Sequence, residues 1–146
     1  MDEWVRLVYF SRSAAQFDVH GVLRIVDTAR TNNARSDITG ALLFSHDHFL
    51  QVLEGDPVVV NALYRKIVLD ERHTDPVLLD YRPIANRCFG KWSMAFCSQE
   101  QATREVLRQF CGADTLRPAL LSGDDAVALL QAVTSHADDR AHDAGS

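Results

Sequence analysis

The sequence has no long hydrophobic run, few cysteines and no excess of basic residues. Its longest apolar stretches, at residues 41–44 and 57–60, fall far short of the roughly 20 residues needed to cross a bilayer. Its net charge of −5 argues against the clustered Lys and Arg of a nucleic-acid-binding surface. Cys88, Cys97 and Cys111 include no C-x-x-C spacing, so we expect buried thiols rather than disulfides or a zinc site. We therefore expect neither a membrane partner nor a nucleic-acid partner.

The sequence also lacks the motifs of common enzymes. It shows no Ser-His-Asp or Cys-His set, no phosphate-binding G-x-G-x-x-G and no paired acids, so an enzyme is disfavoured. His46 and His48 have no further ligand at a suitable spacing, and we expect exposed turn residues there rather than a metal site. Asp2 and Glu3 replace the basic start of a secretory signal, which favours a cytoplasmic protein.

What is present is the pattern of one globular domain. Of the 146 residues, 47% are apolar and 24% are charged, an ordinary balance for a folded protein. Hydrophobic periodicity and turn residues predict strand 5–10, helix 18–34, strands 38–45 and 48–53, helix 57–70, and strands 77–84 and 92–97. Without its last strand, this order is the split βαββαβ, or ferredoxin-like, arrangement. The predicted fold class is therefore α+β, with an added fifth strand and with the first and third strands side by side in the sheet.

The pattern changes after Ser98. Ser98 and Gln101 form a capping box for a helix that reaches about Phe110, and a second apolar helical face follows at residues 126–133. We expect residues 99–137 to form a helical cap on one face of the sheet, with the two earlier helices on the other face. Residues 138–146 form a polar tail.

Two polar side chains fall on one face of the predicted central strands. Reading the third strand by twos places Gln51 between Phe49 and Leu53, on an apolar side. A buried primary amide is costly unless it finds partners, and backbone groups or a water could supply them. Tyr9 lies on the neighbouring first strand, where it could pair with Gln51 or serve as a core aromatic whose hydroxyl is bonded elsewhere.

Further polar residues follow the two helices. One of Asn32 and Asn33 could end the first helix in a left-handed conformation, but two adjacent amides are better suited to binding the edge of a planar heterocycle. Past the second helix, Asp70, Arg72 and His73 could be a solvated helix end, or Arg72 could hold a phosphate or a ribityl oxygen.

Five short motifs occur in the chain in a specific order. They are V-Y-F-S at 8–11, N-N-A-R-S-D-I-T-G-A-L-L at 32–43, F-L-Q-V-L-E-G at 49–55, D-E-R-H at 70–73 and F-G-K-W-S-M at 89–94. Together they resemble the BLUF family, the blue-light sensors that use a flavin, over roughly the first two-thirds of the chain. Beyond Ser98 no effector domain is recognised, so the chain resembles a short, stand-alone member. The resemblance implies that residues 1–98 are the flavin-binding domain.

The resemblance implies photochemical roles for Tyr9 and Gln51, a signal-relay role for Trp92 and Met94, and a place for Ser11 among the cofactor-binding residues. Tyr9 would donate an electron and a proton, and Gln51 would bridge the Tyr9 hydroxyl to flavin N5 and the C4 carbonyl. Ser11 matches a small hydroxyl position near Gln51. Trp92 and Met94 match a pair on the fifth strand that exchanges places near Gln51 and relays the signal. The light-adapted Gln51 would be rotated or tautomerised, with the absorption shifted to the red.

The resemblance also implies a non-covalent cofactor, FAD, with FMN or riboflavin as alternatives. Asn33, with Asn32 beside it, would hold the polar edge of the ring, although many relatives carry His where this chain has Asn32. Asp70, Arg72 and His73 match residues near the ribityl chain and phosphate.

The implied output is protein contact. We expect the fifth strand and the C-terminal helices to signal to a downstream protein of unknown identity, within a homo-oligomer. Two alternatives stay open: a ferredoxin-like interaction module without flavin, which would be colourless, and a flavin enzyme, for which the sequence shows no nicotinamide site.

Overall fold

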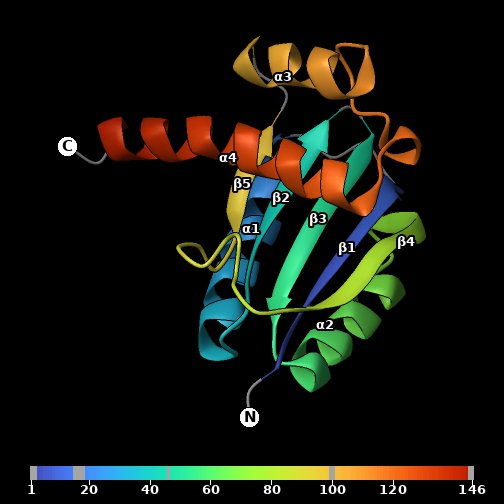
Figure 1. The fold of residues 1–146 in the computed structure, drawn as a ribbon, viewed down its shortest axis with the longest axis vertical. Helices are drawn as coiled ribbons and strands as arrows, with labels where there is room; N and C mark the ends of the chain where they lie inside the picture. The colour runs from blue at the N-terminus through green and yellow to red at the C-terminus, as the bar shows by residue number, and fades with distance from the viewer. Residues whose placement is uncertain (1–2, 15–18, 46, 99–100, 145–146) are drawn as a thin grey trace.

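The fold was determined as a computed structural model, and it describes residues 3–14, 19–45, 47–98 and 101–144. The elements are β1 (Trp4–Ser13), α1 (Val19–Arg35), β2 (Thr39–Ser45), β3 (His48–Gly55), α2 (Pro57–Leu69), β4 (His73–Ile84), β5 (Ala95–Ser98), α3 (Gln101–Cys111), the short 3₁₀ helix η1 (Pro118–Leu120) and α4 (Gly123–Ala144). The strands form one sheet in the order β4-β1-β3-β2-β5 (Figure 1). Among the described residues, β2 and β5 pair in parallel and the other three strand pairs are antiparallel. The predicted α+β fold, with β1 beside β3, is confirmed.

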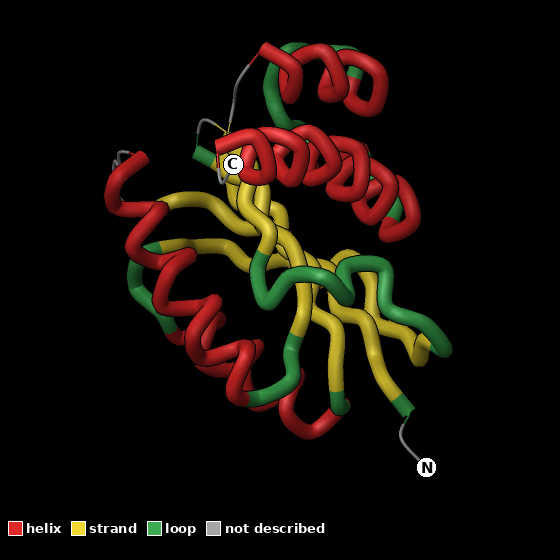
Figure 2. The backbone as a smooth tube through the Cα atoms, turned by 90° about the vertical axis from the view of Figure 1, so that its left-hand side faces the viewer, coloured by secondary structure: helices red, strands yellow, loops and turns green. Residues whose placement is uncertain are grey.

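The sheet is covered on both faces. Helices α1 and α2 lie on one side, which we call the first face, and α3 and α4 lie on the other, the second face (Figure 2). Alternation along β1 divides its side chains between the two: Leu7 and Tyr9 belong to the first-face core, whereas Val8 packs in the second-face core with Leu107 and Leu129. The predicted two-sided covering is therefore correct.

Local sequence accounts for several boundaries. Asp56 caps α2 by accepting from the backbone N–H groups of Val58 and Val59, and Pro57 occupies the first turn as predicted. Gly40 lies so close to the Val52 carbonyl on β3 that a side chain would collide with it. The predicted N-cap at Asp18 lies outside the described residues. The predicted capping box of Ser98 and Gln101 depends on the Gln101 side chain, which is also outside them.

The fifth strand is shorter than predicted. It begins at Ala95, where pairing with Ala41 of β2 starts, and not at Trp92. The carbonyls of Ser93 and Met94, the two residues just before it, accept from side chains of α1 instead of from β2. Trp92 and Met94, predicted on this strand, therefore lie in the segment that precedes it.

The predictions for the cysteines and for the two histidines of the hairpin are only partly correct. Of the three cysteines, Cys97 is buried, but Cys88 and Cys111 are only half-buried. His48 is half-buried and lies 3.0 Å from an oxygen of Asp47, while His46 falls outside the described residues. Within the described part of the chain, no helix is long and apolar enough to cross a membrane, and no three potential metal ligands cluster.

A buried carboxylate holds the loop between β4 and β5 against the sheet. Glu54, at the end of β3, is fully buried. Its oxygens accept hydrogen bonds from the backbone N–H groups of Cys88 at 2.7 Å and Phe89 at 2.9 Å, and from the Thr39 hydroxyl at 3.2 Å. Arg6 is its register partner on β1. These bonds satisfy the carboxylate and fix the start of the segment that leads to β5.

Replacing Glu54 is expected to loosen this loop. In Glu54→Gln, an amide N–H faces a backbone donor, so the variant should lose about 2 kcal/mol or more of unfolding free energy. Chemical denaturation measures this loss. The exposed Glu3→Gln substitution is the control and should change stability by less than about 0.5 kcal/mol. Equal stabilities of the two variants would contradict the assignment.

Candidate functional site

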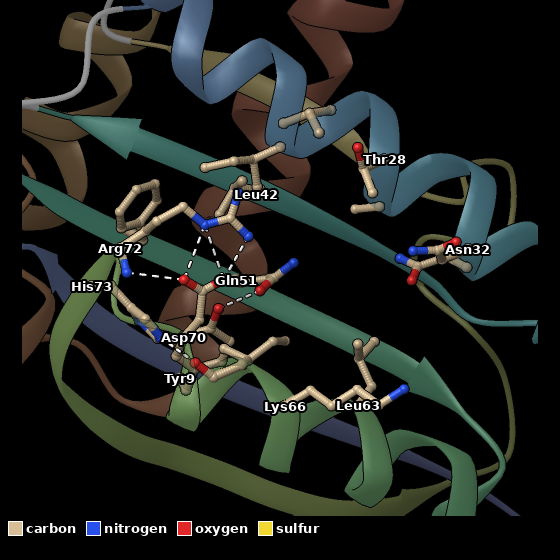
Figure 3. A pocket seen from close by; sticks show the side chains of 16 residues that line it. Tyr9, Thr28, Asn32, Leu42, Gln51, Leu63, Lys66, Asp70, Arg72 and His73 are labelled. Carbon is tan, nitrogen blue, oxygen red and sulfur yellow. Dashed lines mark hydrogen bonds and ion pairs between the residues drawn. The ribbon is translucent and has the colours of Figure 1, made fainter.

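A cavity of about 270 Å³ lies between the first face of the sheet and helices α1 and α2. Its walls are mostly apolar, with Val26, Leu42 and Ile67 among the lining residues, and polar groups are placed at its base and its two ends. Figure 3 shows Asn32 of α1 at one end and Asp70, Arg72 and His73 at the other. An apolar slot with a few convergent polar groups is typical of a site for a small organic ligand.

Tyr9 and Gln51 meet at the base of this cavity. They are register partners on β1 and β3, both are buried, and both line the cavity. The Tyr9 hydroxyl donates a short hydrogen bond to Gln51 Oε1. Tyr9 and Gln51 are therefore hydrogen-bond partners of each other.

The Tyr9 phenol is held in its protonated form. Burial above all, and then the nearby Tyr64 hydroxyl and Asp70 carboxylate, raise the pKa of Tyr9 far above its ordinary value. The Tyr9 ring lies between Tyr64, at 5.3 Å between ring centroids, and His73, at 6.4 Å. Tyr9 thus remains a neutral hydrogen-bond donor at any physiological pH.

The Gln51 amide also contacts the segment before β5. Its Nε2 donates to the sulfur of Met94 at 3.6 Å. Met94 is buried in the first-face core, whereas Trp92 is half-buried against the second-face core. Of these two residues, Met94 is therefore the one next to Gln51.

Ser11 is bonded to His73 rather than placed in the cavity. It lies opposite Phe49 in the β1–β3 register, two residues beyond Tyr9, so it does not face Gln51 directly. Its buried hydroxyl is 2.8 Å from His73 Nδ1, and His73 Nε2 makes a short hydrogen bond to the Ile67 carbonyl. Because a carbonyl only accepts, Nε2 carries the hydrogen of its bond to Ile67, and the second ring nitrogen, Nδ1, is paired with the Ser11 hydroxyl.

The two asparagines belong to α1 and line the cavity together. Asn33 is buried and donates from Nδ2 to the Ser93 carbonyl at 2.8 Å, while Asn32 is exposed. The left-handed residue after the helix is Asp37, with a φ of 54°, so neither asparagine serves as that helix end. The bond to Ser93 leaves the Asn33 carbonyl oxygen and its second N–H available to a ligand edge.

The other end of the cavity carries charge. Arg72 makes paired hydrogen bonds to Asp70, including Nε to Oδ1 at 2.9 Å, and the bond from Arg72 lowers the pKa of Asp70 despite partial burial. Lys66 of α2 also lines the cavity, although it is not one of the predicted site residues. Its position in the sequence could have indicated this, because it lies three residues after Leu63, and residues three apart share a side of a helix.

These residues fit a flavin. The mostly apolar walls suit the fused rings, and the Asn33 donor and acceptor that are not bonded to Ser93 suit their polar edge. Arg72 and Lys66 are cationic residues of the cavity lining, and either suits a phosphate.

Comparisons with known sequences agree with this fit. A family model described as "Sensors of blue-light using FAD" matches residues 4–95. The chain is 41% identical over 90 residues to the blue light- and temperature-regulated antirepressor BluF of Escherichia coli (strain K12), which covers 60% of this chain and 22% of that protein. It is 35% identical over 105 residues to photoactivated adenylate cyclase subunit beta of Euglena longa, which covers 71% of this chain and 12% of that one. The chain thus spans about a fifth or less of these relatives.

Solved structures match over much more of their length. The BLUF protein BlrB in its dark state superposes with a TM-score of 0.72 and 35% identity, covering 93% of this chain and 98% of BlrB. BlsA in its photo-activated state gives a TM-score of 0.79 and 30% identity, covering 90% of this chain and 94% of BlsA. The matches extend past β5 into the helices of the second face. The fold, the site and these matches together place the chain in the BLUF family, the blue-light sensors that use FAD.

Proposed function

We propose that this chain detects blue light through the Tyr9–Gln51 pair and transmits the change to a protein partner through the segment before β5. The observation that carries the proposal is the buried hydrogen bond from the Tyr9 hydroxyl to Gln51 Oε1 at the base of the cavity. When bound, the flavin supplies blue-light absorption and an excited state that can oxidise a nearby phenol. Everything else is done by residues of the chain.

Tyr9 is the proposed electron and proton donor. Burial keeps its proton on the hydroxyl, and the hydrogen bond directs that proton toward Gln51 Oε1. An oxidised phenol is strongly acidic, so loss of an electron moves the proton along this bond. Tyr64 and His73 pack around the ring and fix its position.

Gln51 is the proposed relay. Its amide reaches both Tyr9 and the Met94 sulfur, and sulfur is a weak acceptor, so the bond to Met94 at 3.6 Å is the cheaper one to break. After both the electron and the proton have returned to Tyr9, the Gln51 amide settles rotated or tautomerised, and its changed hydrogen bonding would shift the absorption of a bound flavin to the red. Trp92 and Met94 then pass the change to β5.

The other cavity residues would hold the cofactor. Asn33 and Asn32 bind the polar edge of the ring, while Asp70, Arg72 and Lys66 lie where the ribityl chain and phosphate enter. His73, oriented by Ser11, supports Tyr9 and this end of the cavity. FAD is the proposed ligand, with FMN or riboflavin able to use the same ring contacts.

The proposed output is contact with another protein. Residues 1–98 would form the flavin-binding domain and residues 99–137 the helical cap, whereas the proposed polar tail at 138–146 is for the most part the end of α4, which continues to Ala144. We propose that the chain has no catalytic activity of its own, works in the cytoplasm as a homo-oligomer and signals through the helices packed on the second face to a partner. The packing of α3 and α4 against the face opposite the cavity supports this division.

The photochemical roles are tested with two substitutions. Tyr9→Phe and Gln51→Leu should keep the yellow colour and lose the light-induced red shift, because each removes one end of the hydrogen bond. Absorption spectra before and after blue light measure the shift. Tyr81→Phe is the control, since Tyr81 is exposed and its hydroxyl accepts a hydrogen bond from Asn61. A full shift in either test variant would refute the roles, and a colourless wild-type protein would favour an interaction module without flavin.

The charged end of the cavity is tested by ligand affinity. Arg72→Gln should weaken FAD and FMN binding about tenfold and leave riboflavin within about twofold, because only the first two carry phosphate. Quenching of flavin fluorescence measures the dissociation constants. Arg65→Gln, an exposed change on α2, is the control. Equal weakening for all three flavins would assign Arg72 to the ring or ribityl chain and not to phosphate.

The state of Tyr9 predicts how the photocycle depends on pH. Tyr9 should stay protonated past the ordinary tyrosine pKa of about 10, so the red shift should keep its amplitude from about pH 6 to about pH 10. Above that range the unfolded chain loses the Tyr9 proton before the folded chain does, and stability should fall. Difference spectra and denaturation across this range test both statements. A shift that fades below pH 9 with the fold intact would show that Tyr9 ionises early.

A further inference from the structure

The segment just before β5 is held by side chains of α1 as well as by the sheet. Its three successive carbonyls each accept a hydrogen bond: that of Trp92 from the Gly40 N–H at 3.2 Å, that of Ser93 from Asn33 Nδ2 at 2.8 Å, and that of Met94 from Arg30 Nε at 2.9 Å. Arg30 and Asn33 are three residues apart, so they lie on the same side of α1. A single helix face therefore fixes the last two residues of this segment.

The bond from Arg30 differs from the other two. Its donor is a guanidinium, and a charged donor makes a stronger hydrogen bond to a carbonyl than a neutral amide does. The Arg30 side chain is 47% exposed, and its Nη1 lies 3.6 Å from Asp27 one turn earlier on α1. Asp27 thus helps to orient the guanidinium, and solvent can replace the bond to Met94 when it breaks.

Met94 is held from two directions. Its sulfur accepts from the Gln51 amide, and its backbone carbonyl accepts from Arg30. A change in the Gln51 amide removes or alters the first contact, and the Arg30 bond then resists movement of the backbone. Arg30 is not among the residues that line the cavity, and its hydrogen bond to the Met94 carbonyl connects it to this site.

We propose that Arg30 is a positioning residue that holds the Met94 backbone in its dark-state place and speeds the return of the light-adapted protein to that state. The proposal rests on the proposed function, because it assumes that Met94 moves when Gln51 rearranges. Return to the dark state requires the Met94 carbonyl to approach the guanidinium again. A charged donor that attracts the carbonyl during this approach lowers the barrier of the return step.

The test variant is Arg30→Met, which keeps an unbranched apolar stem and removes the donor. We expect a red shift of unchanged size, because Tyr9 and Gln51 are intact, and dark recovery that is about fivefold slower. Backbone amides of residues 93–97 should also exchange faster with deuterium in the dark, in both flavin-free and flavin-loaded protein. Arg24→Met, an exposed change earlier on α1, is the matched control and should alter neither quantity.

The outcomes separate this proposal from the proposed function. Dark recovery within about twofold of wild type would overturn the role of Arg30, even if Tyr9→Phe abolishes the shift as expected. A lower unfolding free energy with unchanged recovery would show a structural role only, which also overturns it. If wild-type protein gives no red shift, the proposed function fails, while deuterium exchange still decides whether Arg30 holds the segment.

Discussion

The structure depends on one buried hydrogen bond, from the Tyr9 hydroxyl to Gln51 Oε1. Two polar groups on an otherwise apolar face would each be costly to bury alone, and their pairing removes that cost. The pairing also constrains the sheet. A slip of one residue between β1 and β3 would place Val8 or Phe10 opposite Gln51 and turn the phenol toward the second face. The bond therefore fixes both the strand register and the base of the cavity.

From Gln51 the network continues to one segment outside the central strands. The remaining amide group of Gln51 reaches Met94, whose backbone is held by Arg30, while the neighbouring Ser93 carbonyl is held by the cavity residue Asn33. The start of the same segment is fixed by Glu54 through the N–H groups of Cys88 and Phe89. The stretch from Cys88 to Met94 is thus tied to β3 at one end and to α1 and Gln51 at the other.

Sequence patterns predicted the features that depend on neighbouring residues, and they missed the features that depend on contacts between distant parts of the chain. Period-two alternation placed Tyr9 and Gln51 on one face, and the Asp56-Pro57 pair marked the start of α2, because both signals arise within a few residues. The predicted start of β5 was wrong because side chains of α1, 60 and 64 residues away in the chain, bind the carbonyls of Ser93 and Met94. Long sequence separation also hides the role of Glu54, which lies 34 and 35 residues before Cys88 and Phe89.

The shortened β5 has a consequence for signalling. In a continuous strand, residues 92 and 94 would point to the same face of the sheet. Because the strand begins only at Ala95, Trp92 packs against the second-face core and Met94 lies in the first-face core beside Gln51. The short segment from Trp92 to Met94 therefore contacts both cores, the first-face core beside the cavity and the second-face core under α3 and α4. Under the proposed function, a backbone shift that starts at Met94 would also move Trp92, and a change of one amide group beside the cavity would then reach the helices across the sheet through this segment.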